Sequence, residues 1–412
     1  MKKILLVFSM FFSLIAQELT LDDAISKAMD THPDIKRFVL QIDKSKSGVD
    51  VARSDYLPQV NFNAEYNPTK TYVLPVNGQF NTLDSDGYQV STTLHQKIWD
   101  FDRSLSNIDA QKQSIAIAKL SLEDAKAYLV YKVKLQYELI LVQRWAMKVR
   151  QKDLEAKEAL YKQAQALVEQ GMKTSADATR FLSSFYIAKD NLAISQASFD
   201  KARNTLSIYI NETIQSDVIL NNSSLYTKPS TNEKNIIQNS PSLQALEKGI
   251  EKSSLEYNSV HSAHYGSIDF IASYNYQDTL NSYDSTLVGL TLDIPLYSGG
   301  RVSAQAQQAQ INIQSSQAEY DSKVLALREE VESLIIDIKR YEKTIAAKMA
   351  QLDAANSTSN LLDARYKEGL ATYIEVLDAS ALKLDAELGL LSARYERSSA
   401  IHKLEYLQGK TK

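Results

Sequence analysis

The chain has 412 residues, of which only 12 are glycine and 7 are proline. Average usage would give these two residues about 12% of a chain, so their scarcity excludes a turn-rich β-sandwich and favours long unbroken helices. The 46 basic and 50 acidic residues give a net charge of −4, which disfavours a nucleic-acid partner. The chain has no cysteine, which excludes disulfides, thiolate metal sites and a lipid anchor on an N-terminal cysteine.

The first residues have the pattern of a secretory signal peptide. Lys2 and Lys3 precede an apolar run from Ile4 to Ile15, the length typical of such a segment. We expect residues 1–16 to be removed by cleavage after Ala16. Because no later segment approaches the roughly 20 apolar residues of a transmembrane helix, an exported chain of this kind would cross a membrane as a β-barrel.

The chain also repeats itself internally. Matched positions are 208 residues apart at first and 198 residues apart later, as in Pro33 with Pro241, Phe62 with Phe270, Trp99 with Tyr297, Arg103 with Arg301 and Gly171 with Gly369. The two halves are therefore structural copies, and the first carries about ten extra residues between 67 and 93. We divide the mature chain into a first repeat at 17–215, a linker at 216–232 and a second repeat at 233–412.

Each repeat has the same predicted order of a helix, two strands, a very long helix and a shorter helix. The predicted segments are helix 33–54, strands of about 59–67 and 88–98, and helices 104–169 and 174–210, then helix 241–262, strands of about 267–277 and 286–295, and helices 302–367 and 372–408. The strands alternate apolar and polar residues, and polar segments at 67–87 and 277–286 read as loops. The long helices lack glycine and proline and keep a heptad spacing, which predicts coiled-coil packing.

Four glycines mark turns in this scheme. Gly171 and Gly369 follow the long helices and suit left-handed C-caps. Gly299 and Gly300 stand where a strand must turn into the second long helix, which is a role for flexible backbone rather than for a phosphate loop.

Four amphipathic strands are long enough to cross a bilayer but too few to close a barrel. Open strand edges do not occur in lipid, so several subunits must contribute strands to one barrel. Three copies would give twelve strands with a lumen, although this argument alone does not fix the number at three. Aromatic residues near the strand ends suit a membrane-interface belt, with ordinary core aromatics as the alternative: Trp99, Tyr88, Tyr274 and Tyr276.

Several motifs then connect the chain to a known family. They are Leu21-Asp22-Asp23-Ala24-Ile25, Tyr56-Leu57-Pro58, Ile294-Pro295-Leu296-Tyr297-Ser298-Gly299-Gly300-Arg301, Arg365-Tyr366-Lys367-Glu368-Gly369 and Glu375-Val376-Leu377-Asp378-Ala379. In this order, over essentially the whole mature chain, the sequence resembles the TolC-like outer-membrane efflux proteins.

The resemblance implies a mixed membrane protein of the Gram-negative outer membrane, with a long periplasmic extension and no lipid anchor. In this family a homotrimer forms a twelve-stranded β-barrel in outer-membrane lipid that continues into a helical coiled-coil tunnel. The implied partners are a periplasmic adaptor (membrane fusion) protein and an inner-membrane pump of the RND or ABC type. The implied function is the exit duct of a tripartite efflux pump.

The resemblance also implies two groups of site residues near the periplasmic tip. Glu375 and Asp378 match the acids that form a ring in the pore, although two acids near a helix N-terminus can also simply complement its dipole. Tyr366 and Asp177 match members of the network that latches the tip. The arginine that completes this network falls at Ala371, so we expect a weaker latch, or one that uses Lys173 or Arg180, and a tighter one if arginine is restored at 371.

Other functions fit less well. An enzyme is disfavoured because the chain has no nucleophile–base spacing and only five scattered histidines, and we predict no cofactor and no metal site. Two alternatives stay open: the outer-membrane component of a type I polypeptide secretion system, and a periplasmic coiled-coil adaptor. The adaptor would not need the duplicated amphipathic strands.

Overall fold

The computed structural model describes residues 18–76, 78–220 and 232–411. The predicted signal peptide and most of the predicted linker lie outside these ranges. The described helices are α1 (Leu21–Thr31), α2 (Pro33–Ser54), α3 (Arg103–Glu169), α4 (Ser175–Ile210), α5 (Glu233–Gln238), α6 (Pro241–Ser262), α7 (Arg301–Lys367) and α8 (Tyr373–Leu407). None of the helices in these ranges has a stretch apolar enough to cross a membrane.

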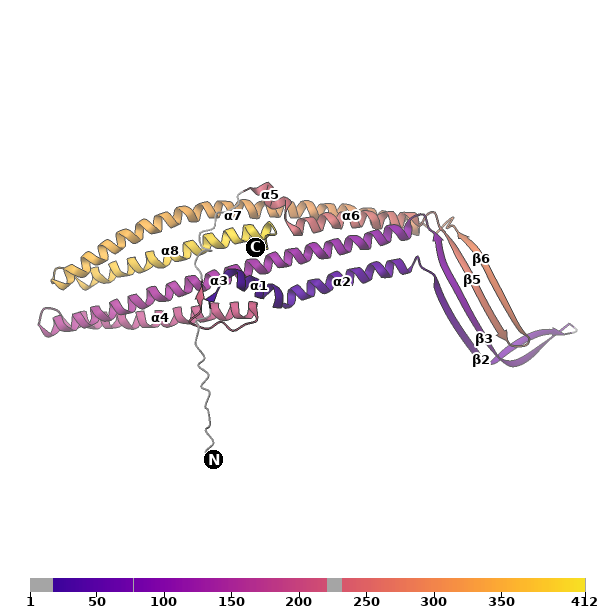
Figure 1. The fold of residues 1–412 in the computed structure, drawn as a ribbon, viewed down its shortest axis with the longest axis horizontal. Helices are drawn as coiled ribbons and strands as arrows, with labels where there is room; N and C mark the ends of the chain where they lie inside the picture. Colours follow the sequence, from indigo (N-terminus) through magenta and orange to yellow (C-terminus); the bar gives the residue numbers. More distant parts are fainter. Residues whose placement is uncertain (1–17, 77, 221–231, 412) are drawn as a thin grey trace, which may run out of the picture. The chain divides into compact units, whose positions relative to one another are not determined.

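Four long strands form one antiparallel sheet in the order β2-β3-β5-β6 (Figure 1). They are β2 (Gln59–Val76), β3 (Gln79–Trp99), β5 (Ser267–Asp278) and β6 (Ser282–Asp293). Two short strands, β1 (Glu18–Leu19) and β4 (Ile219–Leu220), pair in parallel elsewhere. The element order α2-β2-β3-α3-α4 in the first half therefore recurs as α6-β5-β6-α7-α8 in the second.

The chain divides into two compact units, and each contains segments of both halves. One unit comprises the residues up to Lys36, Glu123–Pro241 and Leu325 onward, and the other comprises Arg37–Leu122 and Ser242–Val324. In the first unit α4 returns along α3 and α8 returns along α7 (Figure 1). The second unit holds α2, α6, the beginnings of α3 and α7, and the four-stranded sheet.

The larger core of the first unit joins the N-terminal elements to α3 and α4. Its fully buried side chains include Tyr137, Ile140 and Leu206, and the Tyr137 hydroxyl donates a 2.9 Å hydrogen bond to the carbonyl of Leu19 in β1. A second cluster, described below, lies at the hairpin turns of the same unit. The second unit has a smaller cluster between α2 and α3, built on Val49 and its neighbours.

The helix bounds agree with the sequence-based ones to within a residue or two, but the strands differ. The segment 67–87 was predicted as a polar loop, and this prediction is wrong: β2 continues to Val76 and β3 begins at Gln79. The segment 277–286 is likewise mostly strand. Before Tyr88, strand β3 has only β2 as a strand partner, so the added length is a two-stranded extension of the first hairpin.

Four short elements were not predicted. They are α1, α5, β1 and β4, and β4 lies within the segment assigned as a linker. The first of these helices had a readable start signal, because Thr20 and Asp23 form a capping box at its N-terminus.

Candidate functional site

Two turns join the long helices to their return helices, and each is built around one glycine. Gly171 has a φ of 72° and Gly369 a φ of 76°, values that a residue with a Cβ rarely adopts. The amide of Met172 donates to the carbonyl of Leu167 at 2.9 Å, and the second turn repeats this bond at 2.8 Å. Each long helix therefore ends in a Schellman turn at the glycine that the sequence indicates.

Both return helices begin with the same capping box. The carboxylate of Asp177 accepts the amide of Thr174 at 3.2 Å, and that of Glu375 accepts the amide and the hydroxyl of Thr372, each at 2.7 Å. In return each threonine hydroxyl accepts the amide of its acidic partner. The hydrogen bonds from the amide and hydroxyl of Thr372 hold the pKa of Glu375 below its ordinary value. Both acids therefore have a local structural role.

The two hairpins of one chain share an apolar cluster beside these turns, which we call the tip cluster. Tyr366 of α7 and Phe181 of α4 are both fully buried in it, with ring centroids 5.5 Å apart in an edge-on arrangement. Tyr373 of α8 packs against Phe181 at 6.3 Å. The other buried members of the cluster are Leu160, Ala164, Leu167, Ala371 and Val376.

Two cations of the first hairpin lie on aromatic rings of the second. The ammonium of Lys173 is 5.3 Å from the ring centre of Tyr366, and it lies 3.5 Å from the carbonyl oxygen of Ala371. The guanidinium of Arg180 is 4.8 Å from the ring centre of Tyr373 and donates to the hydroxyl of that tyrosine. Such cation–π contacts contribute about 0.5–1 kcal/mol each at exposed sites.

Tyr366 and Asp177 do not form a hydrogen bond within the chain. Among the described residues the buried hydroxyl of Tyr366 has no hydrogen-bond partner, and the carboxylate of Asp177 is held by its capping box. Burial, and then the negative charge of Asp177, raise the pKa of the Tyr366 hydroxyl. In this chain the hairpins are joined instead by Lys173 and Arg180.

Phe181 and Tyr373 contribute to this contact, and the sequence reading did not select them. The internal repeat could have indicated which residues differ between the two hairpins, because positions 198 apart are equivalent near the turns. Thr174 and Thr372 match at this separation, as do their acidic partners. At the flanking positions the first hairpin has the cations Lys173 and Arg180 where the second has Ala371 and Asp378.

The two acids assigned to the pore ring are both exposed on the first turns of α8. Glu375 and Asp378 are three residues apart and so lie on one face of the helix. Val376 between them points into the tip cluster. The geometry of one chain therefore leaves the carboxylate of Asp378 at the surface, beside that of Glu375.

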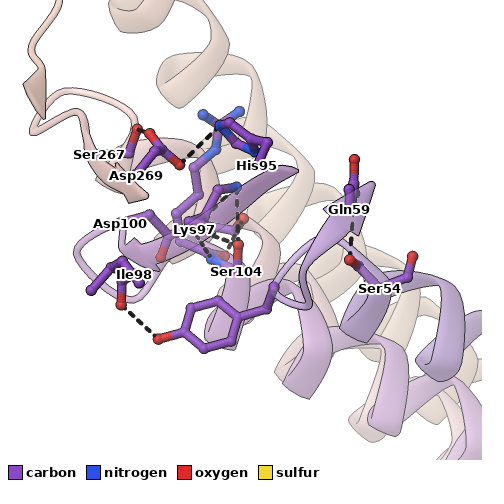
Figure 2. Close-up of polar contacts among 12 residues, drawn as sticks. Ser54, Gln59, His95, Lys97, Ile98, Asp100, Ser104, Ser267 and Asp269 are labelled. Atoms are coloured by element: carbon purple, nitrogen blue, oxygen red, sulfur yellow. Dashed lines mark hydrogen bonds and ion pairs between the residues drawn. The ribbon is translucent and has the colours of Figure 1, made fainter. Parts of the chain in front are cut away.

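The passage from strand β3 to helix α3 is fixed by buried polar groups (Figure 2). Asp100 is 2% exposed, and its Oδ2 accepts the amide of Ser104 at 3.0 Å and the hydroxyl of Ser104 at 2.5 Å. The ammonium of Lys97 lies 3.6 Å from the same oxygen. The hydroxyl of Tyr56 donates to the carbonyl of Ile98 at 3.0 Å. The bonds of Asp100 cap α3, and the bond of Tyr56 attaches the loop between α2 and β2 to strand β3.

The corresponding turn in the second repeat uses glycine where the first does not. Phe101 and Asp102 have φ of 55° and 64°, and Gly299 and Gly300 have φ of 63° and 82° at positions 198 residues later. All four therefore have the same left-handed backbone. The ring of Phe101 stacks on that of Trp99 with centroids 4.3 Å apart, which gives the non-glycine residue a packing role.

The sheet has one apolar and one polar face. Cross-strand partners share a face, and the row Val60, Leu94, Ala272, Val288 is apolar. The row Asn63, Ser91, Asn275, Ser285 on the other face is polar. Among the candidate interface aromatics, Trp99, Tyr88 and Tyr274 are each more than 40% exposed, and the rings of Tyr88 and Tyr276 lie 5.8 Å apart.

Comparison with known proteins decides the family. A family model described as outer membrane efflux protein matches residues 24–212 and 234–410. The chain belongs to the outer membrane efflux protein family. Outer membrane protein TolC of Escherichia coli K12 is 23% identical over an alignment that covers 93% of this chain and 81% of that protein. Outer membrane efflux protein BepC of Brucella suis is 21% identical, with coverage of 92% and 82%.

Solved structures show the same fold. The outer-membrane protein VceC of Vibrio cholerae superposes with a TM-score of 0.81 at 15% identity, covering 94% of this chain and 96% of that one. The open state of the Neisseria gonorrhoeae MtrE outer membrane channel gives a TM-score of 0.80 at 20% identity, with coverage of 95% and 89%.

The predicted family and function are therefore confirmed. This efflux protein is a channel of the Gram-negative outer membrane, with the helical and strand parts of that fold. Its relatives are transport proteins, and the adaptor and polypeptide-secretion alternatives are not favoured.

Proposed function

We propose that three copies of this efflux protein form one continuous duct, a twelve-stranded barrel followed by a helical tunnel, that serves as the exit of a tripartite pump. The observation that carries this proposal is the four-stranded sheet. Strands β2 and β6 are its edges in the described part of the chain, and an edge in lipid must find a partner strand. Pairing the β2 edge of one copy with the β6 edge of the next closes a ring.

The two faces of the sheet support this arrangement. In such a ring the apolar rows face lipid and the polar rows line the lumen, as in other outer-membrane barrels. Trp99 and Tyr88 are eleven positions apart on β3, which is about 37 Å along a strand. With a tilt of about 40° this spans roughly 28 Å, close to the apolar band of such barrels. We assign Trp99, Tyr88, Tyr274 and Tyr276 to the two interface belts.

At the helical end we propose that the paired hairpin turns are the gate. The closed state is held by the contacts of Lys173 with Tyr366 and of Arg180 with Tyr373, which join the two hairpins of each chain. Opening separates the hairpins at these contacts. Asp177 acts in the gate as the cap of α4 and through its charge near Tyr366, rather than as a hydrogen-bond partner.

We also propose that Glu375 and Asp378 of three chains form an acidic ring at this gate. Six carboxylates around a narrow opening favour the passage of cations. The exposed hairpin turns are the part of the chain that would meet a periplasmic adaptor, which links the duct to an inner-membrane pump of the RND or ABC type.

Cysteine cross-linking across the strand edges tests the assembly, and the natural chain has no cysteine to interfere. Asn63→Cys on β2 is combined in turn with cysteine at each position from 284 to 287 on β6, and the outer membranes are oxidised. We expect one register to give a covalent trimer on a denaturing gel. Asn63→Cys alone is the matched control and should stay monomeric. Only monomers and dimers at every register would contradict the shared barrel.

A further inference from the structure

A cluster of buried charges lies between α3 and α8, away from the tip cluster. Glu138 is fully buried, His402 is 3% exposed and Lys134 is 7% exposed. Glu405 has a side chain that is 17% exposed. All four belong to the same compact unit, and the efflux function described above uses none of them.

Both nitrogens of the His402 ring face a carboxylate. Nδ1 lies 3.0 Å from Oε2 of Glu405 and Nε2 lies 2.9 Å from Oε1 of Glu138. A neutral imidazole donates from one nitrogen only, whereas an imidazolium donates from both. With both carboxylates ionised, this geometry therefore requires the charged form of His402.

The local charges balance only when that proton is present. Lys134 donates to Oε2 of Glu405 at 2.8 Å, so two cations then face two carboxylates. Without the proton, Oε1 of Glu138 loses the hydrogen-bond donor that Nε2 of His402 supplies in the described structure. Its second oxygen, Oε2, is buried and has no hydrogen-bond partner among the described residues. A buried charge without a partner is costly, so the loss of one proton destabilises this contact.

The surrounding charged groups are engaged elsewhere. On the α7 side Glu330 pairs with Lys403 at 3.0 Å, and Glu233 of α5 pairs with Arg328 of α7 at 3.2 Å. The tyrosines near the cluster are Tyr131 on α3 and Tyr395 and Tyr406 on α8, and the hydroxyl of Ser398 lies 3.3 Å from Nε2 of His402. None of these neighbours supplies a replacement cation to Glu138.

We propose that Glu138, His402, Glu405 and Lys134 form a proton-dependent clamp, which holds α8 against α3 while His402 is charged and releases it when the ring loses its proton. The α8 helix carries Tyr373 and Glu375 at its other end, so release of the clamp frees the helix that contributes to the gate. The clamp joins two helices of one chain, and its test therefore does not depend on the trimer or on the gate.

The direction of the pH dependence follows from the same contacts. Burial lowers the pKa of His402, but the hydrogen bonds to Glu138 and Glu405 outweigh it and leave the pKa above its ordinary value. For Glu405 burial acts in the opposite direction and raises the pKa, but the hydrogen bonds and charges of His402 and Lys134 lower it to about 2. Because the folded pKa of His402 exceeds the unfolded one, the stabilisation is complete below about pH 6.5. It is lost as the pH rises through the folded pKa.

Hydrogen exchange of the detergent-solubilised full chain measures the clamp directly. Exchange protection of the α8 residues 398–407 is compared at pH 6 and pH 9 after correction for the intrinsic rate, with residues 195–206 of α4 as an internal reference. We expect protection in α8 to fall by about tenfold for each pKa unit between the folded and unfolded states, and the reference to stay constant. Equal protection of α8 at both pH values would overturn the proposal.

Two variants connect the change to these residues. In Glu138→Gln the amide can donate to a neutral His402, so the pH response should disappear while protection at pH 9 is retained. Glu342→Gln is the matched control, because Glu342 pairs with Arg397 of α8 at an exposed position, 3.1 Å away, and it should keep the wild-type response. In His402→Gln protection should be low at both pH values. A wild-type pH response in Glu138→Gln would overturn the proposal even if His402→Gln fails to fold.

Discussion

The tip cluster reverses the effect that we expect from an arginine at position 371. The sequence comparison suggested that an arginine there would complete the latch. Ala371, however, is only 5% exposed and packs with Phe181 and Val376 in the apolar cluster. An arginine would bring an unpaired charge into this cluster, which we expect to cost about 2 kcal/mol or more.

We therefore predict that Ala371→Arg loosens the tip. The thermal midpoint of the trimer should fall by several degrees and the conductance in planar bilayers should rise. Ala371→Ser, a small substitution, is the control and should change both values little. A lower conductance in the arginine variant, with an unchanged midpoint, would restore the original expectation.

The acids of the proposed ring give a second prediction at this scale. Glutamine can replace glutamate in a capping box, so Glu375→Gln together with Asp378→Asn should remove the ring charge without unfolding α8. The double variant should lose the preference for cations and the block by a trivalent cation such as hexamminecobalt.

The matched control is Asp177→Asn, at the equivalent cap of the first hairpin. It should leave the cation preference intact. If the double variant keeps wild-type selectivity and block, these two acids do not line the pore, and their role is limited to the start of α8.

At the scale of elements, the junction between β3 and α3 predicts a stabilising change. Asp102 has a left-handed φ of 64°, and its equivalent in the second repeat, Gly300, has a φ of 82°. Glycine adopts this conformation without strain, so Asp102→Gly should raise stability by about 0.5–1 kcal/mol. Thermal unfolding of the solubilised protein measures this.

The control for this variant is Asp109→Gly, which places glycine inside helix α3. It should lower stability by about 0.3–0.5 kcal/mol, because aspartate is only slightly better than glycine in a helix interior. A loss of stability in Asp102→Gly as well would mean that the side chain of Asp102 contributes more than its backbone strain removes.

The elements also show what the sequence could and could not predict. The long helices were found because heptad spacing and missing glycine and proline persist over 67 residues. The extension of the first hairpin was missed because the residues beyond Tyr66 do not alternate strictly between apolar and polar. The pair Asn77-Gly78 in the sequence is the strongest hairpin signal and would have corrected the loop assignment.

At the hairpin turns the sequence predicted the turn residues but not the contacts between the two hairpins. The glycines and the capping residues could be read locally, because each depends on residues a few positions apart. The contacts of Lys173 with Tyr366 and of Arg180 with Tyr373 join residues 193 positions apart in both cases. Local patterns do not encode such pairs, so the sequence named Lys173 and Arg180 only as possible contributors and did not pair them with Tyr366 and Tyr373.

At the scale of the whole molecule, the gate energy should be a sum over three chains. Each chain of the proposed trimer contributes the two cation–π contacts at its tip, so six such contacts at about 0.5–1 kcal/mol amount to roughly 3–6 kcal/mol. A shift of about 5.5 kcal/mol takes a two-state equilibrium from 1:99 to 99:1. Contacts that are individually weak can therefore control whether the tip is closed.

The central claim is that these contacts close an efflux duct, and single-channel conductance in planar bilayers tests it most directly. The double variant Lys173→Ala and Arg180→Ala is compared with the wild type and with Lys162→Ala and Lys189→Ala, which removes two exposed lysines of the same hairpin that make no contact with an aromatic ring in the described structure. We predict that the gate variant conducts several-fold better than both, while its trimer melts at nearly the same temperature. Equal conductance of the wild type and the gate variant would contradict the account.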